Sequence, residues 1–159
     1  MTSIMKVAQT GEAILSLVAA PVAAEEITQP WLSQLIHAMF LTMQARQGVG
    51  IAAPQVYWSK RIIIVASRPN VRYPDAPEMQ PIVMINPEIT QQSSEENLGE
   101  EGCLSVPDTR GQVLRATHID VRYLDEQAQL QHIQLSGFPA RIVQHEIDHL
   151  NGVLFTDRL

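Results

Sequence analysis

The sequence predicts an α+β fold in which mostly antiparallel strands pack around a buried C-terminal helix that carries an HExxH motif, with one long N-terminal helix. Three observations lead to this fold class. Apolar residues recur at helical spacing over 28–47, short β-branched or alternating runs fill the middle of the chain, and a second helical pattern follows residue 136. The 159 residues suit a single domain, 1–159, with a core of its own.

The long N-terminal helix is predicted over 28–47. Thr28 is a suitable N-cap, Pro30 falls in the first turn, and Gly48 is a natural stop. Its apolar face consists of Leu32, Leu35, Ile36, Met39, Phe40 and Met43. The earlier apolar segment 13–24 is short and contains Pro21, so it predicts a short surface helix and a turn rather than a signal peptide.

Strands are predicted in the middle of the chain. The segments 61–66 and 82–85 are short and β-branched, and the segments 118–124 and 129–135 alternate apolar with polar residues. Because only 125–128 separate the last two, they should form a hairpin. The polar stretches that we expect to be surface loops are 70–80 and 91–98.

The last long element is predicted to be a helix from Ser136, a good N-cap, to Gly152, a good stop, with Pro139 in its first turn. Its apolar residues cover more than one face: Ile142, Val143, Ile147 and Leu150. This helix should therefore be buried on most sides.

Composition excludes several classes of function. The chain has 17 acidic and 11 basic residues, a net charge of −6, and nucleic acid or anionic lipid would need a basic surface instead. We therefore expect no nucleic-acid binding by the chain itself. No stretch approaches the roughly 18 uninterrupted apolar residues of a membrane span, so no membrane association is expected either.

His145 and His149 form the strongest chemical signal, because residues at i and i+4 lie on one face of a helix and can hold one metal ion. Glu146, next to the first histidine, can reach a metal-bound water as general base. The alternative is a pair of core histidines with no ligand.

A catalytic site needs a third protein ligand. Position 155, where one zinc-protease pattern has a histidine, is Phe155, and Asp157 is too close to the helix end to fold back. The ligand should therefore lie upstream, and the single cysteine, Cys103, is the natural candidate. A lone cysteine, which excludes an intramolecular disulfide, is more often a buried small hydrophobe. The less suitable candidates are His37, on an exposed helix side, and His118 and His132, in alternating strands.

A third candidate site segment, after the HExxH helix and the segment around Cys103, is GVGIAAPQ, residues 48–55. Small residues here let a substrate backbone approach closely, and Gln55 could offer an amide donor to an oxyanion. The segment lacks the Lys-Ser/Thr ending of a phosphate loop. A tight helix-to-strand connection would explain it equally well.

The three blocks GVGIAAPQ, EGCLSVP and QHEIDHLNGVLF, in that order, closely resemble the signature blocks of peptide deformylases. The resemblance extends over nearly the whole chain. It implies a metal-dependent hydrolase that removes the formyl group from the N-terminal formyl-methionine of newly made polypeptides and releases formate. The implied partners are N-formylated nascent peptides. Because no transit segment is evident, we expect the cytoplasm of a bacterium as the location.

The resemblance also implies a role for each matching residue. Glu146 would be the general acid/base for a metal-bound water that attacks the formyl carbon, and Gln55 with the N–H of Leu104 would stabilise the oxyanion. The implied metal ligands are Cys103, His145 and His149, and the implied substrate-binding residues are Val49, Gly50, Gly102, Phe138 and Ile142. In this family the metal is usually Fe(II), with nickel, cobalt or zinc as substitutes.

Two departures from the family pattern leave alternatives open. Gly99 and Arg141 fall where some relatives have apolar pocket residues, so the side-chain preference is not carried over. Many bacterial relatives continue into a C-terminal helix that is associated with ribosome contact, whereas this sequence stops at Leu159. Ribosome contact is therefore not carried over either. The alternative functions are a metallopeptidase, a deformylase-like paralogue with another blocked-peptide substrate, a non-catalytic peptide-binding protein and a protein with a structural zinc site.

Overall fold

Helix α2, Gly137–Leu150, is buried along most of its length in the computed structural model, which describes residues 4–159. Every residue over 140–150 is buried, as the apolar pattern predicts. Ser136 precedes the first turn, and Gly152 adopts a left-handed φ of 76° just after the helix. The predicted start and stop of this helix are both confirmed.

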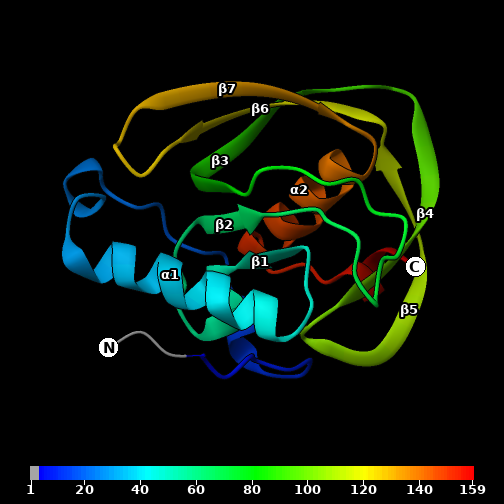
Figure 1. The fold of residues 1–159 in the computed structure, drawn as a ribbon, viewed down its shortest axis with the longest axis horizontal. Helices are drawn as coiled ribbons and strands as arrows, with labels where there is room; N and C mark the ends of the chain where they lie inside the picture. The colour runs from blue at the N-terminus through cyan, green and yellow to red at the C-terminus, as the bar shows by residue number, and fades with distance from the viewer. Residues whose placement is uncertain (1–3) are drawn as a thin grey trace.

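Two antiparallel sheets surround α2 (Figure 1). The larger has the strand order β1-β2-β3-β6-β7, and the smaller is the pair β4-β5. The strands are β1 Gly50–Ala52, β2 Ile62–Val65, β3 Ile82–Gln92, β4 Glu96–Cys103, β5 Val106–Ala116, β6 His118–Leu124 and β7 Leu130–Ser136. Helix α2 contacts strands of both sheets, and Figure 1 shows β6 and β7 arching over it.

The long helix α1, Pro30–Ala45, covers the opposite face of the sheet from α2 (Figure 1). Strand β2 lies between the two helices, and all four of its residues are fully buried. Ile62 and Ile64 pack into the cluster with α1, whereas Ile63 and Val65 pack into the cluster with α2. Alternation along one strand therefore divides the core into two apolar layers. Neither helix of residues 4–159 has the length and apolar character needed to cross a membrane.

The predicted boundaries of α1 need two corrections. The N-cap is Gln29 rather than Thr28, because Pro30 occupies the first helical position. After the helix, Gln47 rather than Gly48 takes the left-handed conformation, with φ 57°. The short helix predicted at the start of segment 13–24 is the 3-10 turn η1, Ala13–Ser16. The other 3-10 turns are η2 Ala24–Glu26, η3 Ala53–Val56 and η4 Phe155–Arg158.

Most of the predicted strands are confirmed, including β2 and the hairpin β6–β7. The predicted loop 70–80 contains no helix or strand. The predicted loop 91–98 was wrong, because β3 continues to Gln92 and β4 begins at Glu96. Pro87 does not end β3, since it falls where pairing with β6 shifts register between Ile85 and Glu88.

The hairpin β4–β5 was not predicted. Only the last three residues of β4 are buried, so the strand has no apolar alternation to reveal it. Its backbone pairs with β5 from Glu96 to Gly102, after which the register shifts at Cys103. This irregularity places Cys103 at the end of β4, beside α2.

Candidate metal centre and active site

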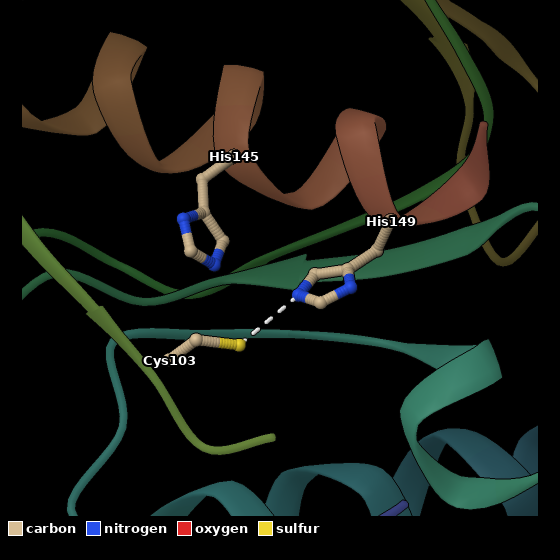
Figure 2. Close-up of side chains that lie close together, drawn as sticks. All are labelled: Cys103, His145 and His149. Atoms are coloured by element: carbon tan, nitrogen blue, oxygen red, sulfur yellow. Dashed lines mark hydrogen bonds between the residues drawn. The ribbon is translucent and has the colours of Figure 1, made fainter. Parts of the chain in front are cut away.

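The structure brings Cys103, His145 and His149 together from two elements far apart in the sequence. One ligand atom from each lies within 4.8 Å of the others, and all three residues are buried. Sγ of Cys103 is 3.3 Å from Nε2 of His149. Figure 2 shows both imidazoles on adjacent turns of α2, facing the sulfur. The i, i+4 spacing of the two histidines therefore produces the convergence that the sequence predicts.

The chemistry of these three side chains fits a divalent metal ion. Burial raises the pKa of the Cys103 thiol, but charge and hydrogen bonds from His149 and His145 outweigh it and lower the pKa well below its ordinary value. The thiolate is the form that binds a metal. One thiolate and two imidazoles form a donor set suited to several first-row ions and leave a coordination position open.

Glu101 orients the first histidine. Its Oε1 accepts a hydrogen bond from Nδ1 of His145 at 2.9 Å, which leaves Nε2 of that ring for a metal. Burial raises the pKa of Glu101, but hydrogen bonds from Arg115 and His145 outweigh it and hold the carboxyl strongly ionised. Arg115 donates to both carboxylate oxygens, from Nε and Nη2, each at 2.9 Å.

The same arginine extends this network to Asp148. Nη1 of Arg115 donates to Asp148 at 2.6 Å, and Arg158 of η4 donates two hydrogen bonds to that carboxylate. Asp148 adjoins His149 on α2. Sequence reasoning missed all four residues of the network. Glu101 and Asp148 lie inside two of the quoted blocks and could have been found, whereas the two arginines belong to no motif.

Glu146 is 4% exposed, and its Oε1 has no hydrogen-bond partner among residues 4–159. Burial raises the pKa of this carboxyl more than the neighbouring histidines lower it. A buried acceptor without a partner is costly, so it marks a functional position. The carboxylate faces Gly50, where a Cβ would lie 2.7 Å from Oε2.

Gln55 is fixed close to the cluster by the turn η3. Its Oε1 accepts a hydrogen bond from the Ala52 N–H at 2.9 Å. Its Nε2 donates to Ser105 at 3.1 Å and lies 3.6 Å from Sγ of Cys103. The side-chain amide is thus held with its donor end toward the thiol.

Every residue that the sequence predicts for the site, except His149, lines one pocket with an empty volume of about 390 Å³. Val49, Phe138 and Ile142 supply apolar wall, and Glu146 faces the same space. Tyr73 and Arg72 also line this pocket and were not predicted to do so, because both come from the loop before β3. Tyr73 packs against Phe138 at 5.0 Å between ring centroids, and its hydroxyl accepts from the Gly102 N–H at 3.0 Å.

Comparisons with known proteins agree with this geometry. Residues 4–159 match the family model described as polypeptide deformylase. Peptide deformylase 2 of Nostoc sp. is 54% identical over 135 residues, which cover 85% of this chain and 75% of that protein. Peptide deformylase 2 of Shewanella oneidensis is 49% identical over 154 residues, covering 97% of this chain and 83% of the relative.

A solved structure is also similar over its whole length. The Met-Ala-Ser-bound class I type b peptide deformylase from Acinetobacter baumannii has 63% sequence identity and a TM-score of 0.98, with all of both chains covered. Sequence, fold and the cluster of Cys103, His145 and His149 thus point the same way. The chain belongs to the polypeptide deformylase family, and it is an enzyme of the class that removes N-terminal formyl groups.

Proposed function

We propose that this enzyme removes the formyl group from N-terminal formyl-methionine of newly made polypeptides in a bacterial cytoplasm, and that it releases formate. One observation carries the proposal. The unpaired carboxylate of Glu146 and the cluster of Cys103, His145 and His149 occupy one buried region beside an apolar pocket.

Cys103, His145 and His149 would hold one divalent ion, with Fe(II) as the proposed native metal and nickel, cobalt or zinc as substitutes. When bound, such an ion supplies Lewis acidity and lowers the pKa of water at the site. Glu101 supports this role because it fixes the ring orientation of His145.

Glu146 is the proposed general acid and base. It accepts a proton from the water that attacks the formyl carbon, and then transfers that proton to the amine nitrogen as the C–N bond breaks. Burial suits this exchange, because it raises the pKa of the carboxyl toward the working pH.

The developing oxyanion is proposed to receive hydrogen bonds from the Gln55 amide and the Leu104 backbone N–H. The amide is held in advance by its bond from Ala52, so it need not reorganise during the reaction. Both residues line the pocket next to Cys103.

The substrate is proposed to lie along Gly50 and Gly102, which both line the pocket. Its methionine side chain would enter the apolar part of the pocket, against Val49, Phe138 and Ile142. The Acinetobacter baumannii relative was solved with Met-Ala-Ser bound, which supports a product of this kind.

Formate release from formyl-Met-Ala-Ser tests this proposal, with anaerobic protein loaded with Fe(II) or nickel. Glu146→Gln is the matched control, since it keeps the shape of the side chain and removes the base. We expect turnover that the variant loses by about three orders of magnitude or more. Metal bound by the wild type without formate release would overturn the proposal and favour a peptide-binding paralogue.

A further inference from the structure

Ser105 is a buried serine close to the metal-binding cluster, and the proposed reaction gives it no role. It lies two residues after Cys103, in the turn between β4 and β5. Its side chain is fully buried, and it is not among the residues that line the pocket. Because it does not face the pocket, Ser105 can influence the reaction only through the residues that it contacts.

The side chain of Ser105 contacts Gln55, the proposed side-chain donor to the oxyanion. Nε2 of Gln55 donates to the serine hydroxyl at 3.1 Å, and Oε1 of the same amide accepts from the Ala52 N–H at 2.9 Å. These contacts lie at opposite ends of one planar amide, so together they restrict its rotation. Since Nε2 carries two hydrogens, one is used by Ser105 and the other is left for a ligand. That nitrogen lies 3.6 Å from Sγ of Cys103.

The backbone of Ser105 is held in register with Gln55 by the N-terminal segment. The Ala8 N–H donates to the Gln55 carbonyl, and the Thr10 N–H donates to the Ser105 carbonyl, each at 2.7 Å. One short segment therefore bridges the turn that carries Gln55 and the turn that carries Ser105. With the two backbones fixed in this way, the hydroxyl is set at the right place to hold the amide.

We propose that Ser105 is a positioning residue, which holds the Gln55 amide where the oxyanion forms. The inference rests on the proposed function, because it takes Gln55 as a donor to that oxyanion. Loss of a complete oxyanion donor costs about 100- to 1000-fold in kcat. Loss of the Ser105 hydroxyl keeps the donor but frees it to rotate, so its effect on kcat should be smaller.

Ser105→Ala tests this role in the nickel-loaded enzyme with formyl-Met-Ala-Ser as substrate. We expect kcat to fall about ten-fold and KM to change by less than about two-fold, because the hydroxyl does not touch the substrate. Metal content should not change, since the bond to Sγ of Cys103 comes from the backbone N–H of residue 105, at 3.4 Å. Thr42→Val is the matched control, because it removes another fully buried hydroxyl, on α1, and should leave kcat intact. A change in KM alone, or loss of the metal, would overturn the proposal.

A double-mutant cycle shows whether Ser105 acts through Gln55. In a Gln55→Ala background, Ser105→Ala should change kcat by less than about two-fold, because the amide that it positions is already absent. An equal loss of kcat in both backgrounds would mean that the serine acts on another part of the site, and the proposal would fail.

Side-chain NMR of zinc-loaded protein provides a measurement that does not depend on turnover. The Nε2 signal of Gln55 is assigned by its absence from the Gln55→Ala spectrum. Its order parameter should be near the rigid value of about 0.85 in the wild type and below about 0.6 in Ser105→Ala. A mobile amide in the wild type would overturn the proposal even if Ser105→Ala did not fold.

The two measurements separate this inference from the proposed function. Formate release with the same order parameter in wild type and Ser105→Ala would overturn the role of Ser105 and leave the proposed reaction standing. An amide that Ser105 orders, in a metal-loaded protein that releases no formate, would overturn the proposed reaction but not the contact that holds Gln55.

Discussion

Gly50 and Glu146 are packed so closely that a Cβ on Gly50 would lie 2.7 Å from Oε2 of the glutamate. The same Cβ would lie 2.7 Å from Cγ2 of Ile142, so the side chains of α2 leave only enough space for hydrogen. Strand β1 therefore approaches the centre of the site because residue 50 has no side chain.

Gly50→Ala should inactivate the enzyme without unfolding it. The added methyl group forces the Glu146 carboxylate to rotate, and small misplacements of a catalytic group cost about 100-fold in rate. We expect kcat/KM for formyl-Met-Ala-Ser to fall by about that factor while the circular dichroism spectrum is unchanged. Gly111→Ala is the control, since its Cβ would meet only the exposed side chain of Leu159. A similar loss in both variants would contradict this reasoning.

Glu146→Gln should raise stability although it removes activity. The wild-type carboxylate is buried with an unpaired oxygen, and such a group costs about 1–3 kcal/mol. A neutral amide of the same shape avoids the burial of charge. We expect the free energy of unfolding of the metal-free protein to rise by about 1–3 kcal/mol in urea titrations. A less stable variant would show that Glu146 is satisfied in the fold.

Glu101→Gln should weaken metal binding. The variant loses the charge that holds Nδ1 of His145, and loss of such an outer partner typically costs about 10- to 100-fold in affinity. It also leaves Arg115 and Arg141 buried with less compensation, which should cost about 3–5 kcal/mol of stability. Competition with a zinc chelator measures the first effect and thermal unfolding the second. Unchanged metal affinity would limit Glu101 to a structural role.

The site was predictable to the extent that its residues form short local patterns. His145, Glu146 and His149 lie within five residues on one helix, so helical periodicity alone fixes their relative positions. Cys103 could be found only by elimination, because the hairpin that carries it has no apolar alternation. The arginines that pair with Asp148 come from β5 and η4, and no sequence pattern links an isolated arginine there to α2.

The same limit applies to the fold. Strands β2, β6 and β7 were found because burial imposes β-branched or alternating residues on them. The hairpin β4–β5 is joined by backbone pairing, and Glu101 of β4 accepts a hydrogen bond from Arg141 of α2. Because backbone hydrogen bonds do not require particular residue types, the sequence of this hairpin shows no apolar alternation that would predict it.

Arg61 should be important for stability at the junction between the N-terminal segment and α2. Its Nη1 donates to the carbonyls of Ala19 and Leu150, at 3.3 and 3.0 Å, and its Nη2 donates to Asn151 at 3.0 Å. Arg61→Ala should lower the free energy of unfolding by about 1–3 kcal/mol, and it should speed amide exchange around Ala19. Lys60→Ala, which loses only a part-exposed ion pair with Glu26 at 3.8 Å, is the neighbouring control. Equal destabilisation by the two variants would refute the role of Arg61.

Metal loading should raise the melting temperature through Cys103. A ligand that binds only the folded state stabilises it by about 4 kcal/mol when its free concentration is a thousand times Kd, or roughly 10 °C for a domain of this size. The donor atoms of Cys103, His145 and His149 already lie within 4.8 Å of one another, so little reorganisation should oppose binding. We expect added nickel or zinc to produce this shift in the wild type, and dipicolinate to reverse it. Cys103→Ala removes the only thiolate and should abolish most of the shift, whereas His132→Ala, at an exposed histidine of β7, should leave it intact. An equal shift in the cysteine variant would place the metal elsewhere on the protein.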